Sequence, residues 1–288
     1  MVVMWALVLL SSIAGAVVTV HRTETALSTN LQDTLQGQAI GEAGVYYAIA
    51  KLTQDVPRIE GEEPWGFDAT PHAWSFAGKE LRITVAGESG RIDLNAAPPE
   101  LLLQLLEVAG VSAPEAEALV DAIQDWRDVD SDTHINGAED PEYEQAGRPY
   151  GAKDATFSSV QELRQVLGMT SQLYDILAPA LTIYSGRSKV NPYFASRLAL
   201  MAALAGDEEE TDRYLESRAE LQPGGAPLPF PGGGASAYLQ QVRDAVYRIT
   251  VATPGSEGGQ FAVEAIVRIT GRDYQILGWE PVGLAGSG

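Results

Sequence analysis

The chain has 288 residues, a net charge of −20 and no cysteine, and 45% of its residues are hydrophobic. That apolar content is enough for one large or two smaller buried cores, whereas the missing cysteine excludes disulfides and thiolate chemistry. The acidic balance disfavours binding to phosphate or nucleic acid. The sequence contains no phosphate-binding loop, nucleophile elbow or HExxH motif, and its three histidines are scattered, so nothing in it indicates an enzyme.

Residues 1–20, MVVMWALVLLSSIAGAVVTV, carry no charge and are long enough to cross the hydrocarbon core of a membrane as a helix. We therefore expect residues 1–22 to form a transmembrane anchor, with Arg22 at the headgroups. A cleaved signal peptide is the alternative, because Ala14-Gly15-Ala16 resembles a cleavage site. The basic segment that such peptides carry is missing, which favours the anchor.

The helical pattern continues beyond the anchor as far as Pro57, the first helix breaker. Apolar residues recur every three or four positions at Leu27, Leu31, Leu35, Ile40, Ala43, Tyr47 and Ala50. A continuous helix over residues 1–56 would be about 80 Å long at roughly 1.5 Å per residue. A long N-terminal helix of this kind, apolar first and amphipathic afterwards, resembles the stem of the type IV pilin family.

Alternating patterns predict β-strands on both sides of a central helical region. Residues 81–85 and 91–94 read as two strands joined by a turn at 87–90, and three more strands are predicted over residues 247–253, 261–269 and 273–279. The simplest assembly is one antiparallel sheet packed on the long helix. This places a pilin-like head at residues 23–94 and 237–282, a helical insertion at 95–222, and a flexible Pro/Gly linker at 223–236.

The insertion contains an internal repeat, since residues 91–110 and 189–206 each place an asparagine ahead of a proline and a glycine fifteen positions after that asparagine. Each copy is typical of a turn, a helix and a glycine stop. Capping boxes at Ser112 and Ser159 are expected to open two further helices. The first repeat resembles a helix-hairpin-helix DNA-binding unit, but it keeps only one of that motif's two glycines and lies in acidic surroundings.

Residues 121–157 are expected to form a long acidic loop without regular structure. Thirteen Asp or Glu residues lie between Glu115 and Glu162, against three basic residues. Five polar residues fall at EF-hand positions 1, 3, 5, 9 and 12: Asp128, Asp130, Asp132, Asn136 and Glu139. Because Thr133 replaces the turn glycine and Asp140-Pro141 is expected to block an exiting helix, we expect a Ca²⁺ loop of another geometry. A solvated acidic loop is the alternative, although Trp126, Tyr143 and Tyr150 favour a packed one.

Several motifs together resemble the general secretion pathway protein K family, the largest minor pseudopilins of type II secretion systems. They are VVMWALVLL, GEAGVYYA, RIDLNAAPPELL, AIQDWRDVDSD, GAEDPEY and FSSVQELRQVLGM, in chain order. The resemblance implies an α+β, pilin-like fold with a helical insertion that binds Ca²⁺. The family's calcium motif falls on Asp125, Asp128, Asp130, Asp132, Glu139 and Asp140, and Asp154 across the loop is a further candidate ligand.

The same resemblance implies a non-enzymatic subunit at the tip of a short periplasmic filament. Its partners would be the I and J type minor pseudopilins and the H type, and its anchor would cross the bacterial inner membrane once. No acidic residue occurs before Glu24, as expected of a tip subunit with no neighbour above it, because an unpaired carboxylate inside a membrane is costly. The basic leader that a prepilin peptidase removes is missing ahead of Met1, so processing is expected from the resemblance alone.

Two other functions are compatible with parts of the sequence. A minor pilin of a type IV pilus, or a surface adhesin, would share the anchor and the head. A glycan hydrolase could use paired carboxylates from the acidic loop, but that chemistry needs two carboxyl groups of opposed pKa on a rigid cleft. No nucleic-acid or small-molecule substrate is expected.

Overall fold

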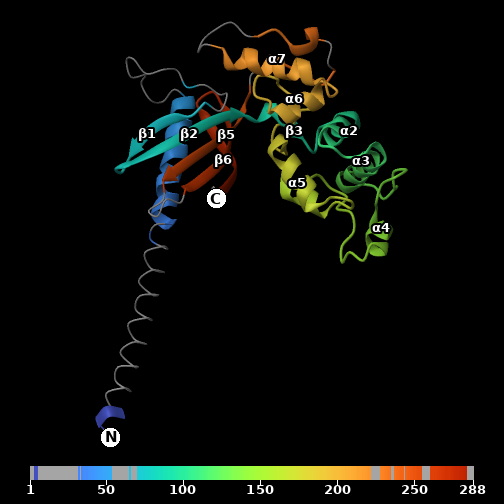
Figure 1. Cartoon of the computed structure of the whole chain (residues 1–288), viewed down its shortest axis with the longest axis horizontal. Coiled ribbons are helices and arrows are strands. Elements are labelled where there is room, and N and C mark those ends of the chain that lie inside the picture. Colours follow the sequence, from blue (N-terminus) through green and yellow to red (C-terminus); the bar gives the residue numbers. More distant parts are fainter. Residues whose placement is uncertain are drawn as a thin grey trace.

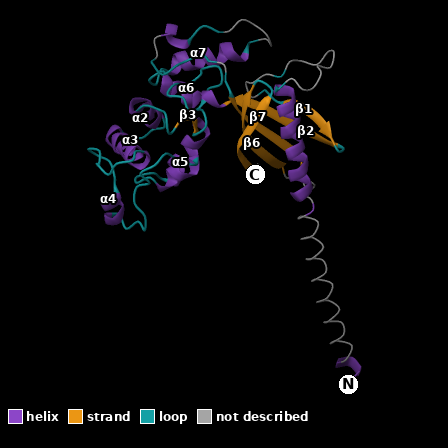
Figure 2. Cartoon of the chain, turned by 180° about the vertical axis from the view of Figure 1, so that it is seen from behind, coloured by secondary structure: helices purple, strands orange, loops and turns teal. Residues whose placement is uncertain are grey.

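The computed structural model describes residues 3–5, 32, 34–53, 65, 70–221, 228–234, 237–242, 244–254 and 260–283. The fold is α+β: an antiparallel sheet carries one helix on a face, and a helical insertion lies beside the sheet (Figure 1). Figure 2 shows the same arrangement from behind, with α3 and α4 far from the N-terminal helix. The predicted plan of a head with an insertion between strands is therefore present.

The sheet has five strands in the order β1-β2-β5-β6-β7, and every neighbouring pair is antiparallel. The strands are β1 (His72–Phe76), β2 (Lys79–Gly87), β5 (Val246–Pro254), β6 (Gln260–Thr270) and β7 (Asp273–Gly283). The insertion enters between β2 and β5, which pair directly, for example Val85 with Ile249. The sheet thus closes across the insertion, as the alternating patterns on both sides of it predicted.

Strand β1 was not predicted. Its alternate residues His72, Trp74 and Phe76 are aromatic rather than aliphatic, and the first two stack on other rings. The Trp74 ring lies 4.2 Å from the ring of Tyr47 on the N-terminal helix. This edge strand is held by aromatic packing from a distant element, which a pattern of aliphatic residues does not reveal.

The N-terminal helix is described over residues 34–52 and packs on one face of the sheet (Figure 2). A Cβ atom on Gly44 would lie 2.7 Å from Val251, and one on Gly41 would lie 2.6 Å from Val263. Two glycines therefore let the helix approach the strands closely. The predicted apolar face was wrong in part: Val45, Ala48 and Ile49 are buried, whereas Ala43, Tyr47 and Ala50 are only half-buried.

The predicted transmembrane anchor at residues 1–22 and most of the predicted first half of helix 1–56 lie outside the described residues. Residues 3–5 and 32 are described and are helical. The described helix reaches residue 52, and residues 54–56 are again outside. Within the described part of the chain, none of the helices combines the length and the apolar character that crossing a bilayer requires.

The helices of the insertion are short and enclose a core of their own. They are α2 (Pro99–Val108), α3 (Ala113–Arg127), α4 (Asp140–Gln145), α5 (Ser171–Leu177), α6 (Arg197–Ala203) and α7 (Glu208–Ala219), with 3₁₀ turns η1 (Glu88–Gly90), η2 (Val160–Gln165), η3 (Ala178–Ala180) and η4 (Pro231–Gly234). The two copies of the repeat supply α2 and α6, which pack against each other. Each copy ends at a glycine with positive φ, Gly110 at 90° and Gly206 at 81°, a conformation that glycine adopts without steric cost.

The strand predicted over residues 91–94 does not join the main sheet. Its core, β3 (Ile92–Asp93), pairs in parallel with β4 (Leu181–Thr182), and Ile92 and Leu94 pack into the insertion core. The predicted turn at 87–90 contains η1 instead of a hairpin. The Ser89 backbone N–H donates to Asp244 at 2.9 Å, and the buried Glu88 carboxylate accepts from Arg248 at 2.6 Å. These long-range polar contacts turn the chain away from the sheet.

Three local predictions need correction. Helix α3 extends to Arg127 and α4 begins at Asp140, so residues 121–157 are not one unstructured loop. Pro141 does not block a helix; it occupies the first turn of α4, where a missing N–H is not needed. The Ser112 hydroxyl donates to the Glu115 carboxylate at 2.6 Å rather than capping backbone N–H groups.

The predicted linker is also more ordered than expected where it is described. Leu228 and Phe230 pack against the insertion core, and residues 231–234 form the 3₁₀ turn η4. The Gly232 backbone N–H donates to the Glu210 carboxylate at 2.7 Å on α7. A segment rich in proline and glycine can therefore pack when apolar residues are placed within it.

Candidate metal centre

Asp125 is the centre of the acidic region. It lies in the last turns of α3 and is fully buried. The Ala138 backbone N–H donates to its Oδ2 at 2.7 Å, and the His134 backbone N–H donates to its Oδ1 at 3.1 Å. A Cβ on Gly137 would lie 1.9 Å from the same carboxylate, so only glycine lets the loop come this close. The Asp125 carboxylate therefore holds residues 134–138 against the end of α3 through two backbone N–H groups.

His134 completes a compact group with Asp125 and Asp128. Ligand atoms of these three residues lie within 4.8 Å of one another. The His134 Nδ1 contacts Asp125 Oδ1, and this hydrogen bond raises the pKa of the imidazole. His134 was not predicted as a ligand, because no second histidine lies near it in the sequence. Only the folding of the loop back onto α3 reveals the contact.

Glu139 and Asp154 approach the same group from the other side of the loop. Glu139 is the N-cap residue of α4 and is 3% exposed, and its backbone N–H donates to Glu142 at 2.9 Å. Burial, together with the charges of Asp154, Asp125, Asp128 and Asp140, raises the pKa of Glu139 to about 7. Asp154 adopts a positive φ of 51°, which is uncommon for a residue with a side chain.

Three oxygens of this group are buried with no hydrogen-bond partner among the described residues: Asp128 Oδ1, Glu139 Oε1 and Asp154 Oδ1. Burial and the charges of Asp130 and Asp125 raise the pKa of Asp128 as well. Buried carboxylate oxygens without partners are costly, and bound cations would compensate them. Carboxylate oxygens are the hard ligands that Ca²⁺ prefers.

The remaining predicted ligands lie at the rim. Asp130 and Asp140 are exposed. The negative charge of Asp130 raises the pKa of Asp128, and that of Asp140 raises the pKa of Glu139. A Cβ on Gly151 would lie 1.6 Å from the Asp140 carboxylate, so the segment around Gly151 packs closely against the start of α4. Asp132 is exposed, and its backbone N–H donates to Asp130 at 3.0 Å, but no described contact brings its carboxylate to the group. The EF-hand spacing also fails at Asn136, which binds Asp121 instead.

Aromatic rings form the inner wall of the loop, as predicted. Trp126 and Tyr143 are buried, with ring centroids 6.0 Å apart, and Tyr150 lies 5.8 Å from Tyr143. The Tyr143 hydroxyl accepts a hydrogen bond from the Leu167 backbone N–H at 2.9 Å. The acidic residues are therefore carried by a packed loop and not by a solvated one.

The fold and this site define a class of protein: a pilin-like α+β head that carries a helical insertion with an acidic, loop-built centre. Residues 84–186 match the family described as type II secretion system (T2SS), protein K. This segment includes all of the candidate ligands.

Relatives point to the same family. The type II secretion system protein K of Klebsiella pneumoniae is 34% identical over 128 residues, which is 42% of this chain and 39% of the relative. The protein of the same name from Dickeya chrysanthemi is 36% identical over 125 residues, 41% of this chain and 34% of the relative. The chain thus spans two fifths or less of the length of these relatives.

A solved structure extends the likeness to the whole fold. The crystal structure of the GspK-GspI-GspJ complex from the enterotoxigenic Escherichia coli type 2 secretion system matches with a TM-score of 0.66 at 17% identity. The match covers 88% of this chain and 99% of that chain. The chain therefore resembles the protein K family of type II secretion systems over residues 84–186, and it shares the fold of the solved structure.

Proposed function

We propose that this chain is a non-enzymatic minor pseudopilin at the tip of a type II secretion pseudopilus, where it helps to start or cap the filament for protein export across the outer membrane. The observation that carries this proposal is the protein K match over residues 84–186 within a fold that resembles a GspK-GspI-GspJ structure over 88% of the chain. The partners would be the I and J type minor pseudopilins and the H type. The anchor at residues 1–22 would cross the inner membrane once and leave the head in the periplasm.

We further propose that the acidic centre binds Ca²⁺. The support is the set of three buried carboxylate oxygens without hydrogen-bond partners among the described residues, gathered near Asp125. The proposed ligands are Asp125, Asp128, Asp130, Glu139, Asp140 and Asp154. Asp132 would join if its exposed carboxylate turned toward Asp130. The ion would fix the loop between α3 and α4 by neutralising charges that otherwise repel one another.

Deleting the gene in its own bacterium tests the filament role. We expect proteins exported by the type II system to accumulate in the periplasm, and a copy of the full chain to restore their secretion. The full chain should also co-purify with the I and J type subunits. Normal secretion in the deletion strain, together with the loss of type IV pili, would overturn the proposal in favour of a pilus subunit.

A further inference from the structure

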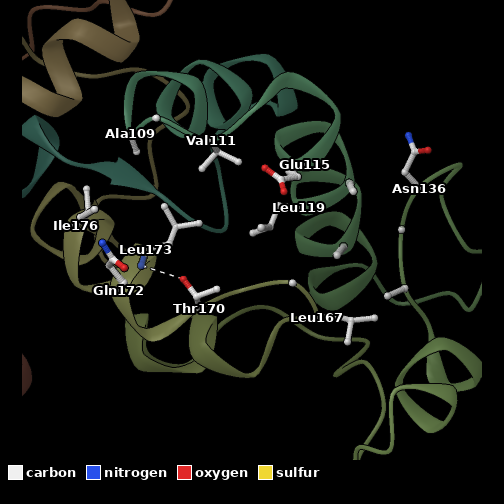
Figure 3. Close-up of a pocket in the computed structure, with 16 residues that line it drawn as sticks. Ala109, Val111, Glu115, Leu119, Asn136, Leu167, Thr170, Gln172, Leu173 and Ile176 are labelled. Atoms are coloured by element: carbon white, nitrogen blue, oxygen red, sulfur yellow. Dashed lines mark hydrogen bonds between the residues drawn. The ribbon is translucent and has the colours of Figure 1, made fainter.

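A cavity of about 560 Å³ lies on the insertion between α3 and α5, beside residues 136–138 of the acidic region (Figure 3). In Figure 3, Glu115 and Leu119 on α3 face Thr170 and Leu173 across the opening. Its volume falls within the range of sites that bind ligands or peptide side chains. We call this cavity the α3/α5 groove.

The floor of the α3/α5 groove is apolar because small residues leave space between larger ones. Ala118 and Ala122 line it on α3, and Gly110 and Gly168 line it in the turns. A Cβ on Gly110 would meet nothing within 4 Å, so the surface is open there. Leu173 and Ile176 form the opposite wall, and Ile176 is 44% exposed. Exposed apolar side chains such as these gain free energy when a partner covers them.

The charge at the α3/α5 groove is of one sign. Glu115 is the only charged residue among those that line it, and its carboxylate is exposed, with the Ser112 hydroxyl as its hydrogen-bond donor. Asp121 lies beside the groove and holds the lining residue Asn136 through the backbone N–H of Asn136 at 3.0 Å. The lining residues include no lysine or arginine. An acidic partner would be repelled and a basic one attracted.

We propose that the α3/α5 groove binds an apolar protein segment that carries a basic residue. A few apolar side chains of the segment fill the space over Ala118 and Ala122, and a lysine or arginine beside them pairs with Glu115. Gln172 and Asn136 offer amide groups at the rim for the segment's backbone. The proposal stands apart from the filament role. No candidate metal ligand lines the groove, but the lining residues Gly137 and Ala138 contact the Asp125 carboxylate, so the binding test keeps Ca²⁺ present throughout.

A random nonapeptide library displayed on phage tests this proposal against the full chain in phosphatidylcholine nanodiscs with Ca²⁺ present, and empty nanodiscs remove membrane binders. Selection runs in parallel on the chain with Ala118→Trp, which fills the groove, and with Ala113→Trp, an exposed position on the same helix that does not line it. We expect peptides rich in leucine, isoleucine, phenylalanine and methionine with lysine or arginine, enriched on the native and Ala113→Trp chains only.

Fluorescence polarisation with a synthetic copy of a selected peptide then measures affinity. We expect roughly ten-fold weaker binding to Ala118→Trp, because apolar burial is lost. Glu115→Gln should weaken binding about five-fold, and Glu117→Gln on the same helix should not change it. Thermal melting of each variant checks that it is folded. Peptides that are acidic, that bind Ala118→Trp equally well, or that fail to enrich over Ala118→Trp would overturn the proposal.

Discussion

The head and the insertion bury their residues against different kinds of neighbour. In the head, Val45 on the N-terminal helix and Val85, Ile249 and Val263 on the sheet are completely buried among other apolar side chains. In the insertion, a similar apolar core lies next to a fully buried Asp125 and a nearly buried Glu139. The buried Glu88 of the head is paired with Arg248 at 2.6 Å, whereas buried oxygens of Asp128, Glu139 and Asp154 in the insertion have no hydrogen-bond partner among the described residues. A cation or a proton would compensate this charge.

This comparison teaches that one chain can combine a region of fixed stability with a region whose stability depends on conditions. Tight helix-to-sheet contact through Gly41 and Gly44 makes the head sensitive to added volume. If the crowded carboxylates bind Ca²⁺ as proposed, the loop between α3 and α4 should be sensitive to Ca²⁺ and to pH. Perturbations of the two regions should therefore differ in their response to chelator.

Gly44→Leu should have the largest effect. A Cβ at this position would lie 2.7 Å from Val251 Cγ1, so the added side chain must push the helix off the sheet. We expect a loss of about 3 kcal/mol in the free energy of unfolding, equal in Ca²⁺ and in chelator. Urea denaturation followed by circular dichroism measures it. Ala39→Leu, at an exposed position on the same helix, is the control. A loss that appears only in chelator would contradict the separation of the two regions.

Removal of Ca²⁺ should have the next largest effect. A ligand that binds only the folded chain at a hundred times its Kd stabilises it by about 2.7 kcal/mol. The thermal midpoint of the full chain should therefore fall when excess chelator replaces Ca²⁺. Glu139→Gln should lose this response, while Glu144→Gln, an exposed residue of α4, should keep it. Equal midpoints in Ca²⁺ and chelator would refute the metal site.

In chelator, stability should fall as pH rises. The pKa of Glu139 is raised to about 7 in the folded chain, so the folded state holds this proton more tightly than the unfolded state does. The stabilisation is complete below the unfolded pKa near 4.5 and is lost as pH passes 7. We expect a decrease of about 2 kcal/mol between pH 5 and 8 at about 1.4 kcal/mol per pKa unit.

Denaturant midpoints across this pH range measure the decrease. Glu139→Gln cannot titrate, so its profile in chelator should be flatter than that of the native chain. With Ca²⁺ present the native profile should reverse, because protonation displaces the ion. A native profile in chelator that rises from pH 5 to 8 would contradict the electrostatic account.

Tyr143→Phe should have the smallest effect. The Tyr143 hydroxyl accepts a hydrogen bond from the Leu167 N–H at 2.9 Å in a buried position. Its removal leaves that N–H unpaired and should cost about 1 kcal/mol, independent of Ca²⁺. Tyr150→Phe is the matched control, since its hydroxyl makes a longer, exposed bond of 3.4 Å to the Gln165 carbonyl. Urea midpoints compare the two, and equal losses would show that burial of the hydroxyl is unimportant.

Local sequence patterns were sufficient to predict the elements in which residue types alternate or recur at a fixed spacing. Alternation predicted β2 and β5 to β7, because a half-buried strand exposes every second residue. The repeated asparagine-to-glycine spacing predicted α2 and α6, which end at Gly110 and Gly206. Edge strand β1 and the parallel β3/β4 pair were not predicted in place. Strand β1 pairs with the adjacent β2, but its aromatic side chains, such as Trp74, pack on the distant Tyr47, and β3 pairs with the distant Leu181.

For the candidate site, residue type and spacing along the chain selected the acidic residues but not their geometry. The sequence by itself determined that many carboxylates lie between helices and beside Trp126 and Tyr143, because these acidic and aromatic residues are neighbours along the chain. Only the tertiary structure decided that Asp125, Asp128 and His134 form a compact group and that Asp125 and Asp154 lie close enough to raise the pKa of Glu139. It also leaves Asp132 exposed. The reason is physical: burial and unpaired oxygens arise from the return of the loop onto α3, a long-range contact that no local pattern contains.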